Sequence, residues 1–218
     1  MARPKRVVVV AGTGTEVGKT FVSAAIALEF TTQRRPVVVR KSAQSFEPDD
    51  TTTDADILGA ATSEDAEVIC PPHRWYPIPM APPMAATALG RDPFTVIDLA
   101  NEVNASWPEG DTAADIGLVE TAGGAWSPQA SDGLHAGDFA DALDADGVLL
   151  VADAGLGVIN GVRGAIAAFG HARTVIVMLN RFNDNDGLHV ANRDWLIHND
   201  HLTVVVDVSE AASALSAL

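Results

Sequence analysis

The sequence has little cysteine, few basic residues and no long hydrophobic run. Its 218 residues include one cysteine, Cys70, so no disulfide can form within the chain, and a reducing compartment is expected. Lys and Arg number 14 against 29 Asp and Glu, which gives a formal net charge of −15. So acidic a surface repels nucleic acid and anionic lipid. No apolar run reaches the roughly 18 residues of a membrane-spanning helix. We therefore expect a cytoplasmic protein that binds neither nucleic acid nor a membrane.

The most informative segment is glycine-rich and spans residues 12–20, Gly-Thr-Gly-Thr-Glu-Val-Gly-Lys-Thr. Four consecutive valines precede it, a pattern typical of a strand buried on both faces of a parallel sheet, and apolar residues at helical spacing follow. In this context a phosphate-binding loop is credible. Its backbone N–H groups and the helix N-terminus attract an anion, Lys19 adds a positive charge, and the Thr20 hydroxyl can bind Mg²⁺. The loop is a variant, because Thr13 stands where the pattern G-x-x-x-x-G-K-[ST] has its first glycine.

Strand-like segments alternate with helical segments along the chain. This alternation predicts an α/β fold of the P-loop NTPase type, with a doubly wound, mainly parallel sheet flanked by helices and ligands bound at the carboxyl ends of the strands. We find no repeat or linker and expect residues 1–218 to form one domain. The proline-rich segment 71–83 is predicted to be an ordered loop or lid without regular structure. The apolar runs that predict strands are 7–10, 37–39, 116–119, 148–151, 175–179 and 204–206.

Charged and hydroxyl side chains follow several of these strands at their carboxyl ends, which meet at one edge of a parallel sheet. Transfer of a phosphoryl group requires a metal ion held by hard oxygen ligands, with cations beside the phosphate. Thr20, Asp54 and Glu120 are therefore predicted to hold the metal, and Lys19 and Lys41 to supply the cations.

Three of these residues also have simpler explanations, which the sequence leaves open. Glu120 would otherwise be a solvated strand end, and Lys41, directly after Arg40, an exposed one. Asp54 follows an acidic segment and would otherwise be ordinary surface charge.

With these motifs in this order, the chain resembles the dethiobiotin synthetases from about residue 7 to residue 180. That family has Thr-Glu-Val-Gly-Lys-Thr in its phosphate loop, a Lys with a Ser four residues later, and an Asp near the next helix. Val-Glu-Gly-Ala-Gly-Gly follows its third strand and Gly-x-Ile-Asn its fourth. The corresponding residues here are 15–20, Lys41 with Ser45, Asp54, 119–124 and 157–160.

The resemblance implies an ATP-dependent ligase of biotin biosynthesis. Such an enzyme converts 7,8-diaminononanoate, CO₂ and MgATP into the cyclic urea dethiobiotin, by way of a carbamate and its phosphoric anhydride. The resemblance also implies catalytic roles for Lys19, Lys41 and Thr15. It implies that Thr20, Asp54 and Glu120 bind Mg²⁺. It further implies a homodimer with the substrate site at its interface. The implied nucleotide contacts are Thr13, Gly14, Thr15, Glu16, Val17, Gly18, Lys19, Thr20, Phe21 and Asn180. The implied substrate contacts are Lys41, Ser45, Thr121, Gly157, Val158, Ile159 and Asn160, of which the last four would bind the substrate's carboxylate.

The chain departs from the family pattern at three places. Thr121 stands where the family has a glycine and adds a side chain where substrate should approach, and Ser42 stands where the family has a proline. The proline that flanks adenine is missing near the last strand, where Asp207 lies. If Asp207 points inward, it would favour guanine, whose N1 and N2 are donors; if it points outward, the base pocket is simply open. Two other functions therefore stay open: a divergent synthetase with another amine or carboxylate acceptor, and a nucleotide-binding paralogue without catalysis.

Overall fold

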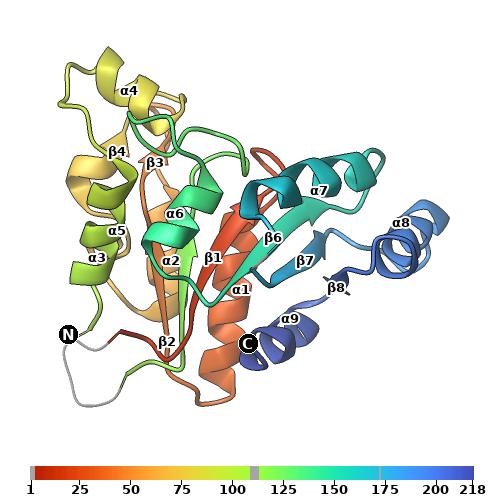
Figure 1. Ribbon diagram of the computed structural model, residues 1–218. Helices are drawn as coiled ribbons and strands as arrows, with labels where there is room; N and C mark the ends of the chain where they lie inside the picture. The colour runs from red at the N-terminus through yellow and green to blue at the C-terminus, as the bar shows by residue number, and fades with distance from the viewer. Residues whose placement is uncertain (1–2, 109–112, 172) are drawn as a thin grey trace.

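The computed structural model describes residues 3–108, 113–171 and 173–218. At its centre is a six-stranded sheet with the strand order β2-β5-β1-β6-β7-β8, all pairs parallel (Figure 1). The predicted α/β fold with a mainly parallel sheet is confirmed. The strands are β1 (Val7–Gly12), β2 (Val37–Lys41), β5 (Ile116–Glu120), β6 (Gly147–Asp153), β7 (Val175–Asn180) and β8 (Thr203–Val205).

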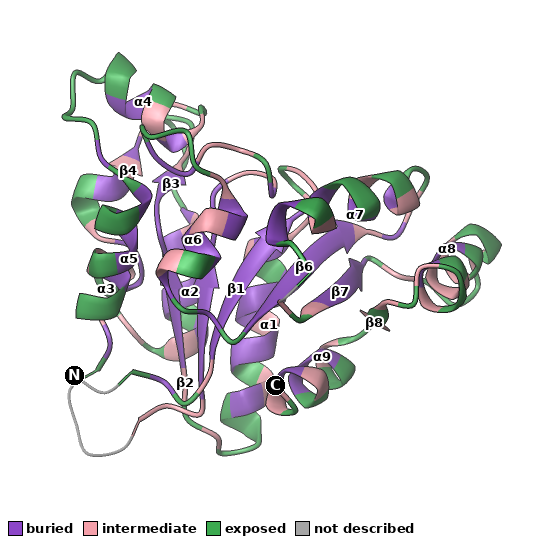
Figure 2. Cartoon of the chain, viewed as in Figure 1, coloured by how far each residue is buried: buried purple, intermediate pink, exposed green. Residues whose placement is uncertain are grey.

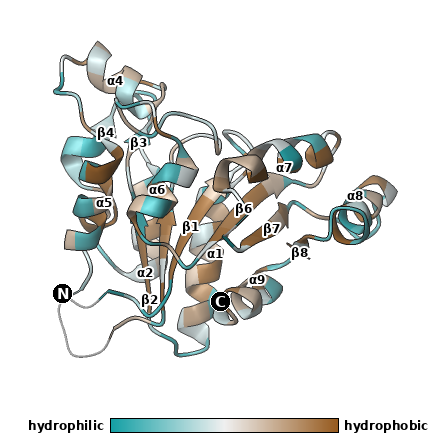
Figure 3. Cartoon of the chain, viewed as in Figure 1, coloured by the Kyte–Doolittle hydropathy of each residue, from teal (hydrophilic) through white to brown (hydrophobic). Residues whose placement is uncertain are grey.

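Helices cover both faces of the sheet, so five of its six strands are almost wholly buried, whereas the edge strand β8 is partly exposed (Figure 2). The valines of β1 alternate between the two faces: Val7 and Val9 belong to one hydrophobic cluster, Val8 and Val10 to the other. Successive side chains of a strand point to opposite faces, which explains why this strand has no polar alternation. Figure 3 shows the same strands as the most hydrophobic part of the chain. The cluster of Val8 and Val10 includes residues of α1 (Lys19–Thr32), α2 (Asp54–Thr62), α3 (Ala66–Ile69) and α9 (Val208–Ser216). The cluster of Val7 and Val9 includes residues of α5 (Val96–Ala105), α6 (Ala136–Ala142), α7 (Val158–Ile166) and α8 (Gly187–His198).

The proline-rich segment contains regular structure, so the prediction that residues 71–83 have none is wrong. The 3₁₀ turn η1 (Pro72–Arg74) leads into β4 (Trp75–Tyr76), and α4 (Pro82–Ala88) begins within the same segment. Prolines occupy the first position of both helical elements, where no backbone N–H is needed. β4 pairs in parallel with β3 (Gln44–Ser45), a two-residue strand too short to give a periodic signal in the sequence.

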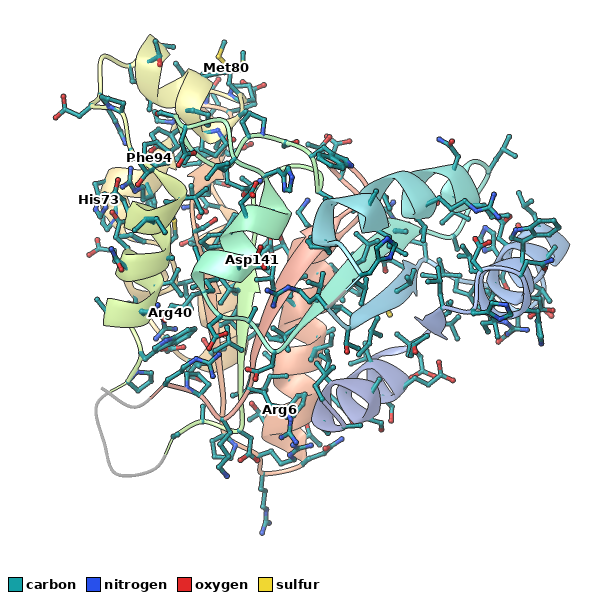
Figure 4. All side chains as sticks on the ribbon, viewed as in Figure 1. Arg6, Arg40, His73, Met80, Phe94 and Asp141 are labelled. Atoms are coloured by element: carbon teal, nitrogen blue, oxygen red, sulfur yellow. The ribbon has the colours of Figure 1, made fainter. Side chains whose placement is uncertain are left out.

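The carboxyl end of β2 is buried, which excludes the exposed strand end that the sequence left open. Arg40 is 2% exposed and Lys41 4% exposed. The Arg40 guanidinium donates to the side chain and the carbonyl of Ser106, both at 2.9 Å, and pairs with Glu64 at 3.0 Å (Figure 4). It also lies 5.8 Å from the centre of the Trp107 ring. The segment that follows α5 therefore covers this strand end.

Among the residues that the structure describes, none of the helices combines the length and the apolar character needed to cross a membrane.

Candidate functional site

A cleft of about 840 Å³ opens at the carboxyl ends of β1, β2 and β5. The glycine-rich loop forms one side of the cleft, and the segment before α4 forms the other, near Met80 in Figure 4. The lining includes most of the residues predicted to act on phosphate and metal. It consists of Thr15, Glu16, Gly18, Lys19, Thr20, Lys41, Ala43, Gln44, Ser45, Asp54, Pro79, Met80, Ala81, Pro82, Glu120, Ala122, Gly123, Ser127 and Arg181.

The structure explains why the loop has its first glycine at position 12. A Cβ atom at Gly12 would lie 2.8 Å from the Gly14 carbonyl oxygen and 2.9 Å from a methyl group of Val17. No side chain fits at position 12. At position 13 the side chain of Thr13 has room, because it faces Gly161 of α7. Gly18 caps α1 with a φ of 93°, a conformation that side chains disfavour. The shifted glycine is thus compatible with a compact loop.

Four residues predicted to bind metal or phosphate meet at the centre of the cleft: Lys41, Glu120, Asp54 and Thr20. Lys41 stands opposite Glu120 in the register of β2 and β5, and its Nζ lies 2.6 Å from Glu120 Oε1 and 2.7 Å from Asp54 Oδ2. The Thr20 hydroxyl donates to the same Glu120 oxygen at 2.8 Å. Glu120 is fully buried, and its Oε2 has no hydrogen-bond partner among the described residues. The cluster therefore presents one buried, unpartnered carboxylate oxygen.

The electrostatics of this cluster favour the charged forms of Lys41 and Asp54. Burial by itself lowers the pKa of Lys41, but the neighbouring Glu120 and Asp54 outweigh it and raise that pKa. Burial likewise raises the pKa of Asp54, and Lys41 more than compensates, so the Asp54 pKa is lowered. At Lys19 burial prevails over the attraction of Glu120 and lowers the pKa. Lys41 and Asp54 are therefore an ion pair at neutral pH.

The described residues contain no group of three or more His, Cys, Asp or Glu side chains placed to share a metal ion, and the cluster itself has two carboxylates, Asp54 and Glu120.

The two departures near the cluster point into the protein. Thr121 is fully buried, and its hydroxyl donates to the Val10 carbonyl at 3.3 Å. Ser42 is also buried, and its hydroxyl donates to the Glu120 carbonyl at 3.4 Å. The Thr121 side chain thus occupies sheet interior and lies outside the cleft lining, whereas Ser45 is part of it.

Several predicted ligand contacts lie outside the lining of the cleft. Gly157 caps the N-terminus of α7, with Leu156 beside it 91% exposed. Asn180 donates to the Val17 carbonyl at 2.9 Å and packs against Gly18, so its amide supports the backbone of the glycine-rich loop. The predicted contacts that the lining does not include are Thr13, Gly14, Val17, Phe21, Thr121, Gly157, Val158, Ile159, Asn160 and Asn180.

Sequence reasoning missed a cation at the rim of the cleft. Arg181 follows β7, donates to the Glu16 carbonyl at 3.1 Å and pairs with Asp153 at 2.7 Å. Its position directly after a predicted strand was the signal available in the sequence. Gln44 had no such signal, because a short pairing between distant residues brings it here. Residues 79–82, which also line the cleft, belong to the segment predicted to be an ordered loop or lid.

Asp207 turns away from the cleft and caps its own helix. Its carboxylate accepts the Glu210 N–H at 2.8 Å at the start of α9. We expect Asp207→Ala to lower the free energy of unfolding by about 1 kcal/mol, the usual value of an N-cap. The ratio of the dissociation constants for ATP and GTP should not change. Urea unfolding and nucleotide titration measure both, and a changed ratio would show that Asp207 faces the base.

A parallel sheet with a glycine-rich loop between β1 and α1, and a buried Lys and Glu at its edge, defines the class of P-loop nucleotide-binding proteins. A family model described as "AAA domain" matches residues 6–214. ATP-dependent dethiobiotin synthetase BioD of Anaeromyxobacter dehalogenans is 33% identical over 96% of this chain and 95% of its own length. The chain belongs to the dethiobiotin synthetase family.

Other similarities are less complete. The enzyme of the same name from Streptomyces coelicolor is 40% identical, but the match covers 71% of this chain and 61% of that protein's length. The signal recognition particle receptor FtsY of Elizabethkingia anophelis, a crystal structure, superposes with a TM-score of 0.56 at 14% identity, covering 99% of this chain and 66% of that one. At that identity the likeness concerns the fold alone.

Proposed function

We propose that this protein is an ATP-dependent dethiobiotin synthetase, a cyclo-ligase that makes a cyclic urea from 7,8-diaminononanoate, CO₂ and MgATP. The observation that carries the proposal is the cluster of Lys41, Glu120, Asp54 and Thr20 beside the phosphate loop. The name of the full-length relative supports the same activity.

The proposed reaction has three steps. One amine of the diamine adds to CO₂ and loses a proton, giving a carbamate. A carbamate oxygen attacks the γ-phosphorus of ATP, and ADP leaves. The second amine then attacks the carbamate carbon, so that the C–N bond of the ring forms, phosphate departs and a proton is released.

The lysines supply positive charge where the phosphoryl group is transferred. Lys19 Nζ donates to the Gly14 carbonyl at 3.2 Å, within the loop that would hold the phosphates. Lys41 is fixed by two carboxylates and stays cationic beside the acceptor. Fixed charges in a water-poor cleft stabilise developing charge more than mobile ones in water. Thr15 and Ser45 line the same cleft and would contact the phosphate and the carbamate.

The donor set fits a magnesium ion. The unpartnered Glu120 Oε2, the Asp54 carboxylate and the Thr20 hydroxyl are hard oxygen ligands of the kind that Mg²⁺ prefers. These three residues would hold the ion, which when bound neutralises charge on the β- and γ-phosphates.

The start of α7 is the proposed site for the substrate's carboxylate in a homodimer. Gly157 has no side chain to cap the helix; the Val158 N–H donates to the Gly155 carbonyl at 3.4 Å, and the N–H groups of Ile159 and Asn160 are the ones proposed to meet the anion. Leu156 beside them is 91% exposed, and in the proposed homodimer it would contact the second copy of the chain. The acceptor carboxylate would then reach across the interface.

The test is turnover by the purified protein with 7,8-diaminononanoate, bicarbonate and MgATP, followed as ADP release and cyclic urea formed. We expect ADP release to depend on the diamine. Turnover only with another amine or carboxylate would indicate a divergent synthetase. Tight nucleotide binding with no turnover for any acceptor would indicate a paralogue without catalysis.

Replacing Glu120 with glutamine should raise the Mg²⁺ concentration for half-maximal activity about tenfold, since the change removes a charge from the metal's surroundings and keeps the shape. The dissociation constant for metal-free ATP should change little. A magnesium titration of activity measures the effect, with Glu67→Gln, an exposed residue outside the cleft, as the control. An unchanged titration for Glu120→Gln would remove Glu120 from the proposed metal site.

A further inference from the structure

Gln44 of β3 lies in the wall of the cleft, and its buried amide has one end hydrogen-bonded and the other without a partner among the described residues. Its side chain belongs to a residue that is 1% exposed. Oε1 accepts the N–H of Ala55, in the first turn of α2, at 2.9 Å. Nε2 has no hydrogen-bond partner among the described residues. A buried donor without a partner is uncommon in native proteins and points to a missing acceptor.

The orientation of this amide is determined by its neighbour. The Ala55 backbone N–H can only donate, so it requires the oxygen of the amide. Turning the amide over would place two donors face to face and would leave both without an acceptor. Nε2 is therefore the buried end without a partner, and it is a donor.

The backbone around Gln44 is held in place. Gln44 and Trp75 are partners in the pairing of β3 with β4, and the next residue, Ser45, is opposite Tyr76. Gln44 lines the same cleft as Lys41 and Ser45. Lys41 is already matched by Glu120 and Asp54. Gln44 thus adds an uncharged hydrogen-bond donor beside Lys41, whose ammonium group is already paired with two carboxylates.

We propose that Gln44 Nε2 donates a hydrogen bond to the carbamate oxygen that is not phosphorylated. This inference rests on the proposed function. The other carbamate oxygen attacks phosphorus, and the remaining one becomes a neutral carbonyl in the phosphoric anhydride. A neutral donor suits that oxygen in both states. When the second amine attacks, negative charge develops on the same oxygen, and a fixed donor there stabilises the transition state.

Two substitutions separate this role from a structural one. Gln44→Glu keeps an oxygen for the Ala55 N–H and replaces the donor with an acceptor, whereas Gln44→Met removes both. If Gln44 only caps α2, Gln44→Glu should behave like the wild type and Gln44→Met should not. If Nε2 binds the carbamate, both variants should lose activity with the diamine.

We expect kcat/KM for the diamine at saturating bicarbonate and MgATP to fall about a hundredfold in both variants, the usual effect of removing one such donor. The dissociation constant of MgATP should stay within about twofold of the wild type. Gln33→Glu, an exposed change of the same charge, is the control and should keep wild-type kinetics.

Wild-type kcat/KM in Gln44→Glu would overturn the inference while leaving the proposed function intact. So would losses in both variants that merely match weaker MgATP binding. A wild-type protein without diamine-dependent turnover would overturn the proposed function, and the role of Gln44 with it. If Gln44→Glu does not fold, wild-type kcat/KM in the uncharged Gln44→Met would overturn the inference.

Discussion

Replacing Lys19 with alanine is expected to lower kcat/KM for MgATP about a thousandfold, or roughly 4 kcal/mol in transition-state stabilisation. Lys19 is the first residue of α1, and its Nζ lies within the phosphate loop, 3.2 Å from the Gly14 carbonyl oxygen. Its removal takes positive charge away from the phosphoryl group during transfer. The contact that is lost lies inside the loop, so the hydrophobic clusters on both faces of the sheet remain packed.

Steady-state ADP release measures this effect, and thermal unfolding checks that the variant is folded. Lys5→Ala is a suitable control, because Lys5 is exposed and pairs with Asp115 away from the cleft. Its kinetics should match the wild type. Normal turnover of MgATP by Lys19→Ala would show that this loop does not bind the phosphates.

Arg40→Met is expected to lower the free energy of unfolding by about 3 kcal/mol, as is typical when one partner of a buried ionic network is removed. The methionine retains much of the apolar stem of arginine. It removes the guanidinium, so the Ser106 carbonyl loses its hydrogen-bond donor and Glu64 loses its ion-pair partner. The partly buried Ser106 carbonyl, left without this donor, adds to the loss.

Urea unfolding measures the difference. Arg34→Met makes the same chemical change at an exposed position and should stay within about 0.5 kcal/mol of the wild type. Equal losses in the two variants would mean that the contacts of Arg40 with Ser106 and Glu64 contribute nothing to stability.

The sheet was predictable because local pattern determines it. The four valines of β1 face both layers of helices, and a strand buried on both sides must be apolar throughout. The meeting of Lys41 with Glu120 was predictable too, because both end parallel strands and such ends share one edge.

What the sequence did not reveal depends on contacts between distant segments. An exposed strand end at Arg40 and Lys41 stayed open as an alternative, because nothing near them in sequence shows that Ser106 would cover Arg40. Gln44 enters the cleft wall through pairing with Trp75, over two residues per strand. The shift of the loop glycine from position 13 to 12 was visible, but its cause is the crowding of Gly12 by Gly14 and Val17, which only the folded loop shows.

The strand order determines at which stage of folding the chain can bind a nucleotide in the cleft. β5 lies between β1 and β2, so the ion pair of Lys41 and Glu120, 79 residues apart in sequence, forms only after a long chain closure. A partly folded chain without β5 in place lacks this half of the cleft. A nucleotide that needs the whole cleft then binds the native state alone, and at a hundred times its dissociation constant it adds about 2.7 kcal/mol to native stability by mass action. A nucleotide bound in this way would shift the folding equilibrium toward the completed sheet.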